Sequence, residues 1–383
     1  MNFSEAKNIM LTKKDIIAEA KRLGFADIGF TGAEPFVSQK EYLLEHQEQY
    51  GWIEKAGFSL LAGTDPRNIL PEAKSIIVLL ESYFEKSFPP RMERHFGRCY
   101  HDDDRVTKSG LALKVKAFRQ FLSENKVDSK VPPHLPHRLS AARAGLGTLG
   151  NNCIFYARRV ARGSSFVFPI ALVVNVEYPP DEPTVDIGCP DWCRSACVAA
   201  CPTRALKGRA MIDPRRCISY LTYYGEGLTP RELREPMGMY VYGCDRCQNV
   251  CPRNTPWLTE EKPPNERVTV KAGDFELSRL LHMDISYFER KIRPHMFYMN
   301  ADDLWRWKMN AARAMGNSLN PEYTADLIRA FKENSDERVK SMTAWALGRI
   351  GGAQAKAGLQ LLQKESAGIV KEEIEEALRR SGA

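Results

Sequence analysis

CPDWCRSACVAACP, at residues 189–202, is the most informative part of this sequence, together with CDRCQNVCP at residues 244–252. With Cys217, which lies between them, these two runs hold eight of the ten cysteines in the chain. Both runs end in Cys-x-x-x-Cys-Pro, a pattern that is hard to obtain twice by chance. Cysteines clustered in this way in a reducing compartment indicate metal binding or catalysis rather than disulfides.

The layout of the cysteines predicts two iron–sulfur clusters of the [4Fe–4S] type. In ferredoxin-like modules, three cysteines of one run bind one cluster and the fourth binds the other. Applied to this chain, cluster one takes Cys189, Cys193, Cys197 and Cys251. Cluster two takes Cys201, Cys217, Cys244 and Cys247. Cys99 and Cys153 lie outside the pattern and are expected to be ordinary buried thiols.

The first run departs from the usual C-x2-C-x2-C-x3-C-P spacing, because each of its first two loops has one extra residue. A displaced, labile or altered cluster one is therefore possible. Zinc is the competing interpretation, since zinc also binds four thiolates. The interleaved double Cys-Pro layout, which zinc sites rarely use, favours iron–sulfur clusters.

Composition limits the class of protein. The chain has 383 residues, of which 43% are hydrophobic and 27% charged, as in ordinary globular proteins. No apolar run approaches the roughly 20 residues that span a bilayer, and residues 1–15 lack the features of a signal peptide. We therefore expect a cytoplasmic protein without a membrane partner. The net charge of +7 suits a polyanion such as RNA, although charge alone favours a basic protein with no such partner.

The sequence divides into three parts. In residues 1–180, a capping box at Thr12 and Asp15 predicts a helix that stops at Gly24. Buried strands are predicted at residues 75–80 and 166–176. An amphipathic helix is predicted at residues 109–122. The small-residue segment 141–150 would allow either close approach to a ligand or tight turns. Residues 181–262, which begin at a proline-rich linker, hold the cysteines. Residues 263–383 favour helices, and Ala-Met-Gly at 314–316 recurs as Ala-Leu-Gly 32 residues later, as in short HEAT-like repeats.

The predicted fold class is therefore α+β. An N-terminal α/β reductase domain (residues 1–180) is followed by a ferredoxin-like double-cluster module (residues 181–262) and a HEAT-like α-helical domain (residues 263–383). The alternative for the last part is a plain helical bundle that covers the core.

Several motifs together resemble the epoxyqueuosine reductase family, over nearly the whole chain. They are LGFADIG (23–29), DPRNIL (65–70), AARAGLG (141–147), CPT (201–203), RCISYLT (216–222), GCDRCQNVCP (243–252), NAARAMGN (310–317) and AWALG (344–348). The resemblance implies a cobalamin held between the N-terminal domain and the cluster module, with clusters that pass low-potential electrons from an external donor to cobalt. It implies reduction of epoxyqueuosine to queuosine in a tRNA anticodon stem-loop. On this basis the expected cofactor-binding residues are Arg143, Gly145, Gly147, Gly150, Ser219, Tyr220 and Gln248.

The chain differs from the family where the substrate is expected. The family's aspartate, taken as the proton donor, corresponds to Val131, and Asp128 is three positions away. The family's lysine after the glycine-rich turn corresponds to Asn151, and two family glutamates correspond to His137 and Tyr224. The catalytic residue is therefore unassigned, and the candidate proton donors are His134, His137, Tyr223 and Tyr224.

These observations lead to three hypotheses about the function. The first is an epoxyqueuosine reductase acting on tRNA. The second is a paralogous corrinoid and iron–sulfur reductase with a different substrate, which would share distant chemistry with reductive dehalogenases. The third is a non-catalytic electron-transfer or corrinoid-handling protein.

Overall fold

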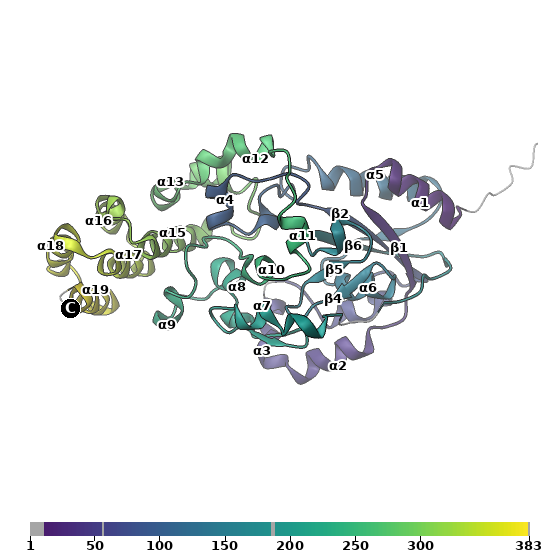
Figure 1. Cartoon of the computed structure of the whole chain (residues 1–383), viewed down its shortest axis with the longest axis horizontal. Coiled ribbons are helices and arrows are strands. Elements are labelled where there is room, and N and C mark those ends of the chain that lie inside the picture. The colour runs from purple at the N-terminus through teal and green to yellow at the C-terminus, as the bar shows by residue number, and fades with distance from the viewer. Residues whose placement is uncertain (1–10, 56, 185–187, 382–383) are drawn as a thin grey trace, which may run out of the picture.

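The computed structural model describes residues 11–55, 57–184 and 188–381. The first ten residues, part of the segment in which the sequence predicts no signal peptide, lie outside it. Figure 1 shows a sheet at one end of the molecule, the cysteine-bearing segments in the middle and a stack of helices at the other end. The C-terminus lies at the end of that stack, far from the sheet. No helix among the described residues is long and apolar enough to cross a bilayer.

The N-terminal part is built on a four-stranded antiparallel sheet with the order β1-β2-β6-β3. Its strands are β1 (Asp27–Gly32), β2 (Ser75–Ser82), β3 (Ser129–Lys130) and β6 (Val167–Val174). Two short pairs lie outside it, β4 (Gly147–Leu149) with β5 (Phe155–Ala157), and β7 (Leu206–Gly208) with β8 (Met211–Ile212). The helices of this part are α1 (Lys13–Arg22), α2 (Val37–Glu45), α3 (Gln47–Lys55), α4 (Pro90–His95), α5 (Leu111–Glu124) and α6 (His137–Arg143).

The two predicted strands are confirmed as β2 and β6. Their apolar runs are unbroken because helices cover both faces of the sheet. Ile77 and Leu79 pack with α1 and α5, whereas Ile76 and Val78 pack on the opposite side with α6. Figure 1 shows α1 and α5 beside the sheet, away from α6. The predicted helix at 109–122 is α5. The helix at Thr12 is α1, which begins with the predicted capping box and is followed by Gly24 at a φ of +77°.

The cysteine module has little regular structure. Its short helices are α7 (Ala196–Ala199), α8 (Ile218–Tyr223), α9 (Arg231–Arg234), α10 (Arg246–Asn249) and α11 (Thr255–Leu258). The helices that follow it are α12 (Glu266–Lys271), α13 (Leu277–His282), α14 (Ile285–Tyr287), α15 (Leu304–Ser318), α16 (Thr324–Glu333), α17 (Glu337–Ile350), α18 (Gly352–Gln363) and α19 (Gly368–Ser381).

The 32-residue repeat has a packing cause. A Cβ added to Gly316 of α15 would lie 2.8 Å from the Cα of Ala346 in α17, and one added to Gly348 of α17 would lie 2.7 Å from the Cα of Ala377 in α19. Each repeat therefore places a glycine where the backbone of the next helix comes close. The series α15, α17 and α19 forms the stack that the spacing predicts (Figure 1).

The apolar core of the helical part extends beyond the predicted boundary at residue 262. It includes Phe84, Phe96 and Tyr242, which come from the two preceding parts, together with Val268 and Trp307. The three domain ranges stay a prediction.

Candidate functional site

Electrostatic interactions link the eight patterned cysteines to one another in the folded chain. Cys189 and Cys197 interact electrostatically with each other and with Cys193 and Cys251, and we call these four the first foursome. The second foursome is Cys201, Cys217, Cys244 and Cys247, in which Cys217 interacts with Cys201, Cys244 with Cys247 and Cys217, and Cys247 with Cys217 and Cys201. All eight thiols are free. Cys247 also interacts with Cys197 of the first foursome, so the division into two ligand sets stays the prediction that the sequence pattern makes.

The widened spacing of the first run is accommodated in its loops. Asp191–Cys193 forms a turn of 3-10 helix. Arg194 and Ser195 follow with φ values of +46° and +53°, in the left-handed region that side chains rarely adopt. Two such residues in succession reverse the chain sharply, so that Cys197 is directed back toward Cys189. Burial raises the pKa of Cys197 to about 11.

The cysteines of the second foursome are partly exposed, whereas Cys197 of the first foursome is buried. Burial raises the pKa of Cys244 and of Cys247 well above the ordinary thiol value. Backbone N–H groups of Ser219 and Tyr220 and the Ser219 hydroxyl donate toward the Cys217 sulfur, which opposes the effect of burial. Ser219 and Tyr220, expected to bind a cofactor, therefore support a cysteine directly.

Within the described residues, no three ligating side chains lie close enough together to hold one metal ion.

Gln248 ties the second run to the N-terminal sheet. Its side-chain nitrogen donates to the Tyr83 hydroxyl at 3.1 Å and to the Ser165 hydroxyl at 3.0 Å. Asn254 bonds to the same Ser165 hydroxyl at 2.8 Å. Because these groups are buried and satisfied, Gln248 has a structural role beside the cysteines.

The glycine-rich segment packs against protein rather than around an open space. A Cβ on Gly147 would lie 2.0 Å from the Tyr156 carbonyl oxygen, and one on Gly145, whose φ is +68°, would lie 2.4 Å from the Glu182 carbonyl oxygen. At Gly150 the added atom would meet the Tyr156 ring at 2.6 Å. Tight packing, one of the two explanations that the sequence allowed, accounts for these glycines.

Arg143 is also engaged within the protein. Its guanidinium donates to the Glu34 and Pro35 carbonyls at 3.0 and 3.2 Å and covers the Phe36 ring at 3.9 Å. It therefore fixes the segment that leads into α2.

Asn151 bridges the first foursome to its surroundings. Its N–H donates to the Cys189 sulfur at 3.2 Å, its side-chain nitrogen donates to the Ser195 hydroxyl at 3.1 Å, and its side-chain oxygen accepts from the Arg209 N–H at 3.1 Å. The asparagine at this position therefore joins the first cysteine run to the β7–β8 hairpin. Sequence reasoning treated it only as a departure from the family.

Of the candidate proton donors, His137 has no open ring nitrogen. Its Nδ1 accepts from the Ala171 N–H at 2.9 Å, and its Nε2 lies 2.8 Å from the Pro132 carbonyl oxygen, to which it donates. Burial lowers the pKa of His137, which favours the neutral ring. His134 lies in the same loop, with its carbonyl packed against Gly63.

The two residues considered for the family's aspartate are also engaged elsewhere. Val131 packs against the apolar core beside α1 and α5. The Asp128 carboxylate accepts from the Asn175 side chain at 3.0 Å. Val131 has no ionisable group, and the exposed Asp128 carboxylate is held by Asn175.

Tyr223 and Tyr224 belong to an aromatic cluster that joins all three parts of the chain. Tyr223 stacks on Tyr298 with a centroid distance of 4.9 Å, and its hydroxyl lies 3.2 Å from that of Tyr100. Tyr224 lies between Tyr298, at 5.9 Å, and Trp52, at 5.3 Å. Burial raises the pKa of Tyr224 to about 12.

Arg105 extends this cluster to the surface. Its guanidinium lies 4.3 Å from the Tyr298 ring and 4.7 Å from that of Phe297, which is 42% exposed, and Asp103 holds it in place. Sequence reasoning missed Trp52, Arg105 and Tyr298, because each is a single residue without a local motif.

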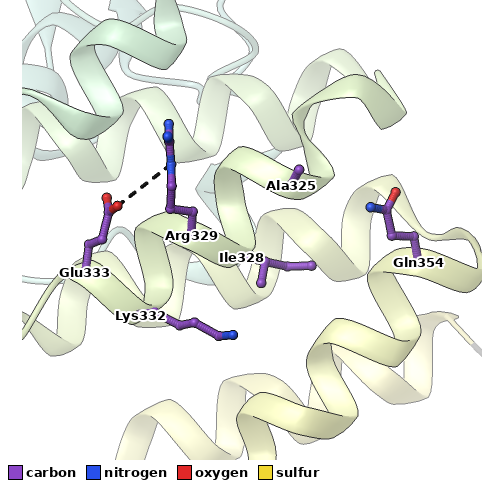
Figure 2. Close-up of a pocket in the computed structure, with 6 residues that line it drawn as sticks. All are labelled: Ala325, Ile328, Arg329, Lys332, Glu333 and Gln354. Carbon is purple, nitrogen blue, oxygen red and sulfur yellow. Dashed lines mark ion pairs between the residues drawn. The ribbon is translucent and has the colours of Figure 1, made fainter.

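A shallow hollow lies elsewhere, between α16 and α18 of the helical stack. Figure 2 shows its lining, in which Arg329 pairs with Glu333 while Ile328 and Lys332 extend from the same helix. Its place at the far end of the molecule separates it from the cysteines (Figure 1).

Comparisons with known proteins agree with this architecture. Residues 191–254 match the family described as 4Fe-4S double cluster binding domain, and residues 298–379 match HEAT repeats. The first match identifies two [4Fe–4S] clusters as cofactors of this chain, in place of zinc, and the second confirms the HEAT-like prediction.

Relatives cover nearly the whole chain. Epoxyqueuosine reductase of Bacillus cereus is 32% identical, over 89% of each chain, and that of Bacillus subtilis is 30% identical, over 98% of each. A structure of the Bacillus subtilis enzyme with its catalytic Asp loop swung out of the active site has a TM-score of 0.79 at 28% identity, covering 96% of this chain and 98% of that one. An epoxyqueuosine reductase with an epoxyqueuosine-modified tyrosine tRNA stem loop has a TM-score of 0.77 at 27% identity, covering 97% and 99%. This chain belongs to the epoxyqueuosine reductase family.

Proposed function

We propose that this protein reduces epoxyqueuosine to queuosine in the anticodon loop of tRNA. The observation that carries the proposal is the similarity over 97% of the chain to an epoxyqueuosine reductase with an epoxyqueuosine-modified stem loop. The net charge of +7 suits an RNA ligand. The helical repeats and the Arg105–Phe297 surface are of the kinds that contact backbone and unstacked bases. We further propose a cytoplasmic location.

We propose that the first foursome ligates cluster one and the second foursome cluster two. The mutual approach of the thiols within each set supports this assignment. The replacement Cys244→Ala is expected to remove cluster two and leave a soluble chain, and unchanged iron content would contradict the assignment.

We propose cobalamin as the second kind of cofactor, at the junction of α3 with α8. The indole nitrogen of Trp52 is buried there, and no described residue accepts a hydrogen bond from it. The Trp52 ring lies 4.6 Å from that of Tyr220. An unused donor between aromatic rings fits a large conjugated ligand, so Trp52 and Tyr220 would hold it. Cobalamin, when bound, would supply low-potential electrons for the two-electron reduction of the epoxide, in which two protons are taken up and the oxygen leaves as water.

The chain's own residues would bind and orient the base and exclude water. Tyr224 is the candidate whose position best fits proton donation, because it lies on the Trp52 side of the aromatic cluster. The engaged ring of His137 favours a structural role for that residue.

A paralogous reductase with another substrate is the second candidate. The observation that favours it is that Val131, at the position of the family's acid, packs into an apolar core. A non-catalytic electron-transfer or corrinoid-handling protein is the third possibility.

The deciding experiment uses anaerobically purified protein with both clusters, cobalamin and a synthetic stem loop that carries epoxyqueuosine. Conversion to queuosine under reducing conditions is expected, with stem-loop affinity that falls steeply with salt. If the protein binds cobalamin but neither converts nor binds the stem loop, the result would favour the paralogous reductase. If it does not bind cobalamin, only the electron-transfer hypothesis would remain.

A further inference from the structure

We propose that the loop around Trp192 is the docking surface for an acidic electron-transfer protein. The inference rests on a cluster at the first foursome, but not on the identity of the substrate. Trp192 is 67% exposed, although it lies between Cys189 and Cys193. The turn that carries it is held by two backbone bonds, from the Cys193 N–H to the Pro190 carbonyl at 3.2 Å and from the Arg194 N–H to the Asp191 carbonyl at 3.1 Å. A large aromatic side chain is therefore held in water on the short loop between two of the patterned cysteines.

The first foursome is the natural point of entry for electrons. The segments next to the second foursome are covered by α15, since Asn310 donates to the Thr222 and Val241 carbonyls at 2.7 and 3.0 Å. The first run instead faces outward through Trp192 and the exposed Arg194. Electron transfer slows steeply with distance, so a protein donor gains most by binding where a cluster is nearest to the surface.

The exposed charged residues at positions 192–209 are all basic. Arg194, Arg204, Lys207 and Arg209 are exposed, and their side chains form no ion pair with any described carboxylate. Asp191 is the only acidic residue between positions 189 and 209. Asn151 brings two of these basic segments together, because it bonds both to Ser195, next to Arg194, and to the Arg209 backbone. Exposed basic residues on segments that Asn151 joins, together with one exposed aromatic group, fit a partner with an acidic surface and a small apolar centre.

The chemistry of the encounter is a single outer-sphere step. One electron leaves a reduced flavin or [2Fe–2S] centre in the partner, which is oxidised by one electron. The oxidised cluster at the first foursome gains that electron, and no bond or proton is exchanged. RNA is the other polyanion that this surface would attract, but RNA gains nothing from contact with a loop that lies between two cluster ligands.

The test uses the anaerobic holoprotein and a reduced acidic flavodoxin as the probe. Stopped-flow absorbance gives the second-order rate constant of cluster reduction, and titration of the two proteins gives their affinity. Trp192→Ala and the double replacement Arg194→Glu with Arg209→Glu are each expected to lower the rate constant at least tenfold. The double replacement should also flatten its dependence on salt.

Matched controls lie on the helical stack. Lys356→Glu makes, on exposed α18, the charge change of one of the two arginine replacements, and Leu361→Ala removes a side chain that is 61% exposed. Both should leave the rate constant unchanged. Dithionite, which needs no docking surface, should reduce all variants at the wild-type rate. If Trp192→Ala lowers the iron content, the rate constant of the single replacement Arg209→Glu tests the proposal instead, because Arg209 lies outside the cysteine run.

An unchanged flavodoxin rate constant in the variants would overturn the proposal. Loss of stem-loop affinity with an intact flavodoxin rate would assign the surface to RNA instead. Epoxyqueuosine conversion driven by dithionite is a separate readout, so failure of the proposed function and failure of the docking surface can be told apart.

Discussion

Replacement of Asn310 by alanine should weaken the second foursome from a distance. Asn310 is fully buried in α15, and its side-chain nitrogen bonds to the Thr222 carbonyl, at the end of the helix that follows Cys217, and to the Val241 carbonyl, just before Cys244. Two lost hydrogen bonds cost about 1 kcal/mol each, and a buried carbonyl without a partner costs about 1–3 kcal/mol more. The side-chain oxygen of Asn310 itself has no partner among the described residues, and its removal recovers part of this cost. We expect a net loss of about 2–4 kcal/mol.

The assay is anaerobic guanidinium unfolding followed by circular dichroism, together with iron per chain. Asn310→Ala should unfold at lower denaturant and lose iron toward the content of one cluster. Asn310→Asp should lower the unfolding midpoint and the iron content further than Asn310→Ala does, because a carboxylate would face two carbonyl oxygens. The control is Asn125→Ala, since Asn125 is exposed and bonds only to its own helix. An unchanged midpoint with full iron content in Asn310→Ala would refute this account of how α15 supports the cysteine segments.

Three further predictions concern other parts of the molecule. Glu373→Gln should lower the free energy of unfolding by about 3–5 kcal/mol, because it leaves the buried Arg234 guanidinium without its countercharge. In the wild type the Glu373 carboxylate accepts two bonds from this guanidinium, at 2.9 and 3.1 Å. Thermal unfolding measures the loss, and a decrease in Tm of less than about 2 °C would argue against it. Burial lowers the pKa of His101 to about 3, so on acidification the unfolded chain protonates at this histidine before the folded chain does. The free energy of unfolding should therefore fall by up to about 1.4 kcal/mol per pH unit as the pH decreases from 6.5 toward 3. His101→Gln should make this pH dependence less steep, and an equally steep dependence would exclude His101 as its cause. Phe297→Ala should weaken stem-loop binding about tenfold through lost stacking beside Arg105, as measured by fluorescence titration, and wild-type affinity would remove this surface from the RNA site.

Sequence and structure agree where the signal is local. The spacing within each run predicts two iron–sulfur clusters, and the match of residues 191–254 to a double-cluster domain confirms that prediction. The capping box at Thr12 is likewise a contact between residues three positions apart. The recurrence of glycine in the C-terminal part predicted the helical stack because each repeat meets its neighbour in the same way.

What the sequence left open depends on contacts between distant segments. The apolar runs showed that strands were buried, but not that the sheet is antiparallel, with β6 between β2 and the short β3. The glycine-rich segment had two explanations, and only the position of Tyr156 showed that protein atoms occupy the space beside it.

The substrate side shows the same limit. His137 was a candidate acid by residue type, and its two partners, Pro132 and Ala171, become visible only after folding. Trp52, Tyr224 and Tyr298 are separated by more than 70 residues, so no local pattern announces that they meet. Chain spacing therefore predicted that two clusters are present, because the spacing of cysteines within a run is a local feature of the sequence. The surroundings of the reacting groups were decided by tertiary packing, because those contacts join elements that no short-range rule relates.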